Sequence, residues 1–128
     1  MVGNAQVGAI LVATDLERAK KFYVEKLGLR VVETSAPNGD FAMFEAGDGT
    51  MLYLYLREGG SKAEHTVAGW VVDDIETAVA ELRDKGVVFE QYDLPGLQTD
   101  ERGIAESGPA KSAWFKDTEG NILAVNEM

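Results

Sequence analysis

Two stretches of the chain carry apolar residues at the spacing of an α-helix. The first stripe consists of Leu16, Ala19, Tyr23 and Leu27, and the second consists of Ile75, Ala78, Val79 and Leu82. Apolar positions three and four residues apart line one face of a helix. Gly28 follows the first stripe and Gly86 follows the second, which suits a helix stop because glycine tolerates positive φ. The pattern predicts two amphipathic helices with buried stripes.

The start of each predicted helix has the form of a capping box. Thr14 and Glu17 occupy the N-cap and N3 positions of the first copy, and Asp73 and Glu76 occupy them in the second. In such a box the N-cap side chain accepts the N3 amide, while the N3 carboxylate reaches back to the N-cap amide. The two copies lie 59 residues apart, which indicates an internal repeat.

Strand patterns surround both helices. Predicted strands precede the helices at residues 8–13 and 66–72 and follow them at residues 29–33 and 87–91. A second repeat, with an offset of 71, relates residues 42–52 to residues 113–123. Both copies have the pattern strand, turn, strand, in which Asp48-Gly49 and Glu119-Gly120 provide the turns of two β-hairpins.

Together these repeats predict an α+β fold in which two βαβββ modules form a single domain, residues 1–128. The first module covers residues 4–58 and the second covers residues 65–128. The extra length of the second module falls in residues 93–110, which are rich in glycine, proline and acidic side chains. One helix covers only one face of a four-stranded sheet. We therefore expect curved mixed sheets whose open faces form a cleft, where the function should reside.

Side-chain alternation identifies the residues expected to line this cleft. Leucine alternates with methionine or tyrosine along residues 51–56, so Met51, Tyr53 and Tyr55 should share the open face. The same rule places on open faces Val67, Gly69, Val71, Ile122, Ala124 and Asn126. An aromatic wall opposite small residues suits a planar or hydrophobic ligand. For Tyr53 we favour ligand contact, whereas for Tyr55 ligand contact and interface packing are equally well supported.

Four further residues are aromatic or titratable candidates. Tyr92 precedes residues 93–110, which could form a lid over the cleft or a plain surface loop. Trp114 lies in the second hairpin, and the sequence pattern allows its side chain to face either the cleft or the core. Alternation places Trp70 on the helix side. His65 is the only histidine, and we expect it to be solvated at a strand edge rather than to act as a metal ligand or general base.

Composition narrows the classes of function. The chain has 12 basic and 22 acidic residues, and its formal charge of −10 disfavours binding to nucleic acid. Without cysteine it can form no disulfide, thiolate metal site or cysteine nucleophile. No apolar stretch approaches the roughly 20 residues of a membrane span, and the first residues do not have the pattern of a signal peptide. We therefore expect a cytoplasmic protein that does not enter membranes.

Four motifs occur in a recognisable order along the chain. They are Asp-Leu-Glu-Arg-Ala-Lys-Lys-Phe-Tyr at residues 15–23, Leu-Gly-Leu at 27–29, Val-Asp-Asp-Ile at 72–75 and Trp-Phe-Lys-Asp-Thr-Glu-Gly-Asn at 114–121. With the duplication, this order resembles the vicinal-oxygen-chelate superfamily of glyoxalase I, extradiol dioxygenases, fosfomycin-resistance transferases and bleomycin-resistance proteins. The resemblance covers nearly the whole chain and implies the two-module fold and a homodimer. Activity does not follow from it, because this fold hosts unrelated chemistries.

In the metal-dependent members of that superfamily, the resemblance implies one ligand from the first and one from the last strand of each module. The corresponding positions here are Gly8, Tyr53, Val67 and Ala124. A catalytic divalent ion typically needs about three His, Asp or Glu ligands. We therefore expect neither a metal nor another cofactor.

These observations lead to three hypotheses. We favour a metal-free binding protein of the bleomycin-resistance kind, which sequesters a hydrophobic or aromatic, antibiotic-like small molecule. Its ligand contacts would come from Met51, Tyr53, Tyr55, Val67, Tyr92, Trp114 and Ala124. The alternatives are an enzyme of glyoxalase, lyase or isomerase type without the usual metal, and a structural or regulatory subunit whose cleft packs a partner. In the enzyme, acid or base could come from Tyr53, His65, Asp100 or Glu101. The missing ligands disfavour glyoxalase I and extradiol dioxygenase activity.

Overall fold

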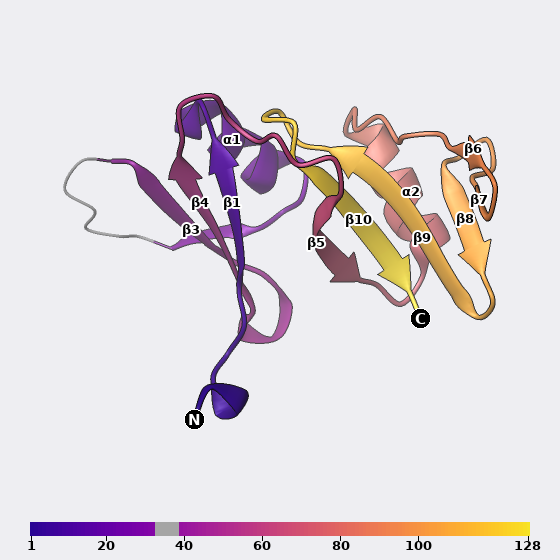
Figure 1. Ribbon diagram of the computed structural model, residues 1–128, viewed down its shortest axis with the longest axis horizontal. Helices are drawn as coiled ribbons and strands as arrows, with labels where there is room; N and C mark the ends of the chain where they lie inside the picture. Colours follow the sequence, from indigo (N-terminus) through magenta and orange to yellow (C-terminus); the bar gives the residue numbers. More distant parts are fainter. Residues whose placement is uncertain (33–38) are drawn as a thin grey trace. The chain divides into compact units, whose positions relative to one another are not determined.

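The computed structural model describes residues 1–32 and 39–128, which form two compact units, Met1–Lys62 and Ala63–Met128. Each unit contains a four-stranded mixed sheet and one α-helix (Figure 1). The predicted α+β fold of two repeated modules is therefore confirmed. Among the described residues no helix could cross a membrane, since both α-helices have only 10 residues.

The first unit follows the expected order of elements. Its elements are β1 (Ala9–Ala13), α1 (Leu16–Glu25), β2 (Arg30–Val32), β3 (Phe41–Glu45) and β4 (Met51–Leu56). The strand order is β1-β4-β3-β2, with β1 parallel to β4 and the other pairs antiparallel. Short 3-10 helices occupy Val2–Asn4 and Gly47–Gly49. Of the strand expected at residues 29–33, Glu33 lies outside the described residues.

The second unit repeats this order with an insertion. Its elements are β5 (Thr66–Val71), α2 (Ile75–Asp84), β6 (Asp93–Leu94), β7 (Leu97–Gln98), β8 (Ile104–Ser107), β9 (Ala110–Lys116) and β10 (Ile122–Glu127). The sheet order is β5-β10-β9-β8, and β6 and β7 form a separate hairpin. The bounds of α2 are those of α1 displaced by 59 residues, and those of β10 are those of β4 displaced by 71. Both offsets found in the sequence are thus structural repeats.

The strand predicted at residues 87–91 is wrong. Within this segment Phe89 forms only an isolated bridge with Phe115, and β8 takes the edge position of the sheet instead. The hairpin of β8 and β9 turns at Gly108, which has a φ of +60°. It closes a much shorter loop than pairing of residues 87–91 along β9 would, at a lower cost in chain entropy.

The predicted N-caps are each one residue too early. Asp15 and Asp74 cap the helices, and their carboxylates accept the amides of Arg18 (3.0 Å) and Thr77 (3.3 Å). In the first helix Asp15 replaces Thr14, because an ionised carboxylate is a strong acceptor and is favoured by the positive end of the helix dipole. In the second helix both candidates are aspartates, and Asp74 is the one whose carboxylate accepts the Glu76 and Thr77 amides and the Thr77 hydroxyl.

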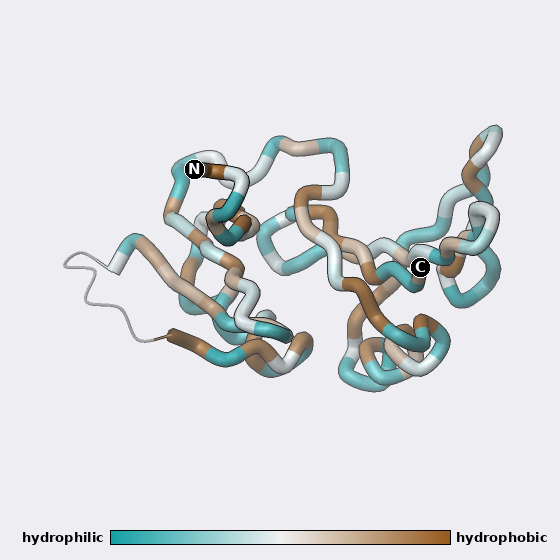
Figure 2. Tube along the Cα trace, turned by 90° about the horizontal axis from the view of Figure 1, so that it is seen from below, coloured by the Kyte–Doolittle hydropathy of each residue, from teal (hydrophilic) through white to brown (hydrophobic). Residues whose placement is uncertain are grey.

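Each helix covers one face of its own sheet. The buried side chains between α1 and the first sheet include Leu16, Ala19, Phe22, Tyr23, Leu11, Ala42, Phe44, Leu52 and Leu54. Those of the second unit include Ile75, Val79, Phe89, Ala113, Phe115, Leu123 and Val125. Burying a large apolar side chain contributes roughly 1.5–3 kcal/mol, so these two layers hold the fold together. Along the chain, apolar strands alternate with more polar connections (Figure 2).

Candidate functional site

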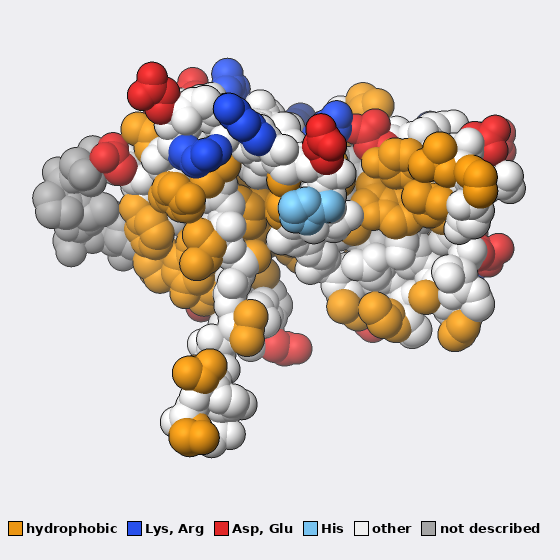
Figure 3. Space-filling model, in the orientation of Figure 1, with side chains coloured by type: hydrophobic (Ala, Val, Ile, Leu, Met, Phe, Trp, Pro, Cys, Tyr) orange, Lys and Arg blue, Asp and Glu red, His pale blue; other side chains and the backbone are white. Residues whose placement is uncertain are grey.

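The open face of the first sheet is apolar and aromatic. Tyr53 of β4 lies in register between Ile10 of β1 and Met43 of β3, and Tyr55 is paired in the same way with Val12 and Phe41. The intervening Leu52 and Leu54 are buried under α1. The predicted alternation is therefore confirmed. Hydrophobic side chains gather over β1, β3 and β4 in Figure 3. Of the open-face residues, Ile10 is 66% and Tyr55 41% exposed.

Tyr53 is fixed on this face by its neighbours. Its ring stacks on that of Phe41, with centroids 5.9 Å apart and planes 28° from parallel. The ring also covers Gly8, where an added Cβ would lie 2.6 Å from Tyr53 Cε2 and 3.2 Å from the carbonyl oxygen of Met51. Glycine at this position therefore leaves room for the tyrosine ring, and a side chain there would displace it.

The open face of the second sheet combines an aromatic side chain with very small ones. Trp114 of β9, Ala124 of β10 and Gly69 of β5 lie in one cross-strand row. Val67 has no partner in β10, because the register shifts between Ile122 and Leu123. Its place on the open face stays a prediction. Trp70 pairs with Val125 and so lies on the helix side, as predicted.

Tyr92 completes the aromatic part of this face. Its ring meets the indole of Trp114 edge-on, with centroids 5.5 Å apart. Its backbone N–H donates to Thr99 Oγ1 (2.8 Å), and the Thr99 N–H donates to the Tyr92 carbonyl (2.9 Å). Burial, with a contribution from the charge of Glu90, raises the pKa of Tyr92. The phenol is therefore a hydrogen-bond donor, not a base, near neutral pH.

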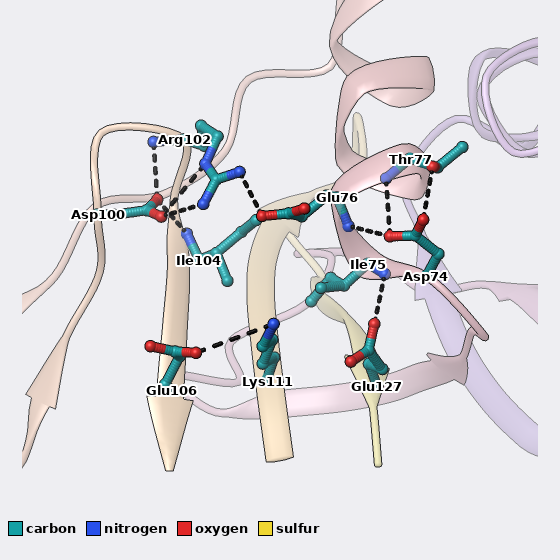
Figure 4. Close-up of polar contacts among 10 residues, drawn as sticks. All are labelled: Asp74, Ile75, Glu76, Thr77, Asp100, Arg102, Ile104, Glu106, Lys111 and Glu127. Atoms are coloured by element: carbon teal, nitrogen blue, oxygen red, sulfur yellow. Dashed lines mark hydrogen bonds and ion pairs between the residues drawn. The ribbon is translucent and has the colours of Figure 1, made fainter. Parts of the chain in front are cut away.

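Part of the segment expected to be a lid or a surface loop is held to its own module by an ion-pair network. Arg102 donates to Asp100 Oδ2 (2.8 Å) and to Glu76 Oε1 at the start of α2 (2.8 Å), as Figure 4 shows. Asp100 Oδ1 also accepts the backbone amides of Arg102 (2.8 Å) and Ile104 (3.0 Å). The sequence analysis did not single out Arg102. Five acidic residues lie near it along the chain, and this pattern could have indicated an arginine that forms ion pairs.

The titration of Asp100 reflects these contacts. Burial raises its pKa, but the hydrogen bonds from the Arg102 side chain and from the Ile104 and Arg102 amides outweigh burial, so the pKa is lowered. The pKa of Arg102 is raised by its hydrogen bonds to Glu76 and Asp100. The Asp100 carboxylate is thus already engaged in hydrogen bonds that hold the loop, which argues against its use as a general base.

A pocket of about 660 Å³ lies beside this ion-pair network, away from the open face. It is lined by Glu76, Gly96, Leu97, Gln98, Thr99, Asp100, Arg102, Ile104, Glu106 and Lys111. Its cationic groups are already engaged, since Arg102 binds two carboxylates and Lys111 lies 3.9 Å from Glu106. The pocket contains none of the seven predicted ligand contacts.

The residues present do not fit the metal implied by the family resemblance. Gly8, Val67 and Ala124 have no donor atoms in their side chains, and the Tyr53 ring packs on Phe41 and Gly8. Within residues 1–32 and 39–128, no three His, Asp or Glu side chains are grouped to hold an ion. His65 is exposed just before β5, as expected (Figure 3).

The predicted contacts thus form two groups, one on each sheet. Met51, Tyr53 and Tyr55 share the open face of the first, and Trp114, Ala124 and Tyr92 lie together on the second. Ligand contact by any of them stays a prediction. Asn126 and Ser112 also lie on the second face, and only the former was expected there.

Comparison with known proteins agrees with this architecture. A protein of the glyoxalase/bleomycin resistance protein/dioxygenase superfamily from Sphaerobacter thermophilus DSM 20745 is 25% identical, with a TM-score of 0.70 and 100% of both chains covered. TnmS3, an antibiotic binding protein from Streptomyces sp. CB03234, is 20% identical, with a TM-score of 0.70 and 97% of each chain covered. A protein assigned to the glyoxalase family from Bacillus anthracis is 16% identical, with a TM-score of 0.75 and coverage of 97% of this chain and 94% of its own.

No curated protein sequence matches the chain. The sequence profile of the Glyoxalase/Bleomycin resistance protein/Dioxygenase superfamily matches residues 5–125. Because this match spans nearly the whole chain, the protein belongs to the glyoxalase/bleomycin resistance protein/dioxygenase superfamily.

Proposed function

We propose that the protein binds an aromatic or hydrophobic small molecule on its open sheet faces, without a metal and without changing the molecule chemically. The observation that carries this proposal is the placement of aromatic rings on faces that the helices leave uncovered: Tyr53 with Phe41, and Trp114 with Tyr92. Large flat rings over an apolar surface provide contact area for a ligand at a small entropic cost.

The type of ligand is suggested by one structural relative. TnmS3 is an antibiotic binding protein and shares the fold over 97% of this chain. Sequestering an antibiotic-like compound needs only a complementary surface and no reacting group. The net charge of −10 further favours a neutral or cationic molecule over an anionic one.

A homodimer is part of this proposal. Ile10 on the first sheet and Val71 on the second are 66% and 74% exposed, and a second copy could cover such side chains. Light scattering at tens of micromolar should give twice the monomer mass of 13.9 kDa. A particle of monomer mass would contradict the dimer and leave ligand binding as a separate question.

Equilibrium dialysis with 2-methylnaphthalene tests the function directly. Wild type should bind saturably, and Trp114→Leu should weaken binding by about tenfold or more, as loss of a central aromatic contact does. Trp70→Leu is the matched control, because Trp70 lies on the helix side of the same sheet. Its affinity should stay within about threefold of wild type. No saturable binding, or equal weakening by both variants, would contradict the proposal.

A further inference from the structure

A hydrogen-bonded polar pair lies on the open face of the second sheet. Asn126 of β10 is in register with Ser112 of β9 and with Val71 of β5. The Ser112 hydroxyl donates to Asn126 Oδ1 at a distance of 2.7 Å. This contact fixes the orientation of the amide, so that the Nδ2 end, with its two N–H donors, points away from Ser112.

The Nδ2 end of this amide lies over Gly69, which has no side chain. A Cβ added to Gly69 would be 2.9 Å from Asn126 Nδ2. Every buried side-chain nitrogen or oxygen among the described residues has a hydrogen-bond partner, while no contact within the described part of the chain uses Nδ2. Nδ2 is therefore accessible to solvent, and a ligand acceptor can take the place of water there.

The next row of the sheet places an aromatic ring beside this amide. Trp114 lies there in register with Ala124 and Gly69, two residues, about 7 Å, along the strands from Ser112 and Asn126. Ala124 is only 3% exposed and the Asn126 amide already covers Gly69, so neither residue is an open floor for a ligand. A flat ring packed against the Trp114 indole therefore has the Asn126 amide at its edge.

We propose that Asn126 determines specificity, so that the second sheet selects flat aromatic ligands carrying a neutral hydrogen-bond acceptor such as a carbonyl. This inference rests on the proposed function and names the chemical class of its ligand. An oriented amide donor matches a carbonyl oxygen. The acidic character of the chain disfavours a carboxylate in that place.

A pair of nearly isosteric probes isolates this hydrogen bond. 2-Acetylnaphthalene has a carbonyl where 2-isopropenylnaphthalene has a methylene group. Equilibrium dialysis of wild type should give a roughly three- to tenfold tighter affinity for the ketone, the usual net effect of one hydrogen bond. Asn126→Leu should reduce this ratio to about one, because leucine offers no hydrogen-bond donor to the ketone.

Two further variants keep the test decisive. Asn126→Asp retains the shape of the side chain but replaces the donor by an acceptor, and should abolish or reverse the preference even if Asn126→Leu does not fold. Ser112→Ala releases the amide and should lower the ratio partially.

Equal binding of the two probes by wild type, or a ratio that survives in Asn126→Asp, would overturn the role of Asn126 alone. Failure of both probes to bind would overturn the proposed function as well.

Discussion

The ring of Tyr92 meets the indole of Trp114 at 74°, with 5.5 Å between their centroids. The two residues come from different elements, since Trp114 belongs to β9 and Tyr92 precedes the β6–β7 hairpin. Thr99 directly follows the second strand of that hairpin, and its side-chain hydroxyl accepts a hydrogen bond from the Tyr92 N–H. An inserted hairpin thus positions one of the aromatic rings on the open face.

Thr99→Val should loosen this aromatic pair. The variant leaves the partly buried Tyr92 amide without its side-chain acceptor, at a cost of about 1–3 kcal/mol. In a Trp70→Phe background, emission of Trp114 should shift to the red as its indole becomes more solvated. Thr118→Val, on the β9–β10 turn, is the control and should leave the spectrum unchanged. An unaltered spectrum in Thr99→Val would show that the hairpin does not hold Tyr92 in place.

The Asp100–Arg102 contact should make stability depend on acid pH. The pKa of Asp100 is lowered in the folded state, so its contribution is present above the unfolded pKa of about 3.9 and is lost as pH falls through the folded pKa. Urea unfolding should therefore find Asp100→Asn less stable than wild type at pH 7, with a smaller difference near pH 3. The pKa of Asp74 is also lowered, chiefly by Thr77, so wild type should lose further stability in acid. A difference that is constant with pH would contradict this assignment.

Asp117→Ala should be among the most destabilising substitutions outside the apolar core. Asp117 is buried, and its carboxylate accepts the amides of Glu119 (2.8 Å) and Asn121 (2.9 Å) and the Asn121 side chain (2.7 Å). Removing it strands donors in the buried turn between β9 and β10, at a cost of about 2–4 kcal/mol. Asp93→Ala removes only an exposed contact with Gln98 and should cost under about 1 kcal/mol. Chemical denaturation of both variants measures the difference, and similar losses would contradict the account.

Most of the fold follows from short-range patterns. The stripes beginning at Leu16 and Ile75 and their glycine stops predict α1 and α2, and the leucine–tyrosine alternation predicts the two faces of β4. These features depend on local backbone geometry, which the sequence records directly. The N-caps were missed by one residue because two adjacent polar residues compete for the position.

The insertion and the polar contacts could not be predicted in the same way. At the edge of the second sheet, β8 pairs with β9 in the position predicted for residues 87–91. Deciding between these two pairings requires comparing their stabilities, and the periodicity of the sequence does not contain that information. The bulge at Val67 and the Ser112–Asn126 contact depend on cross-strand register. Register is set by the whole sheet, so it becomes visible only once the strands are paired.

Purified protein should contain no stoichiometric divalent metal. Gly8, Val67 and Ala124 offer no ligand atoms, and the donor of Tyr53 alone would not hold an ion at the affinity of a catalytic site. Elemental analysis should find far less than one zinc, nickel, iron or manganese per chain, with or without dialysis against a chelator. A ratio near one, together with a chelator-dependent loss of thermal stability, would be inconsistent with metal-free binding.

A ligand-induced chemical-shift map tests the central claim most directly. With ¹⁵N-labelled protein and 2-acetylnaphthalene, the largest amide shifts should fall on open-face positions around Tyr53, Gly69, Trp114 and Ala124 and at the Asn126 side chain. The backbone amides of α1 and α2, which cover the opposite faces, should change little. Shifts confined to the helices or to the pocket beside Arg102, or no shifts at all, would contradict binding on the open faces.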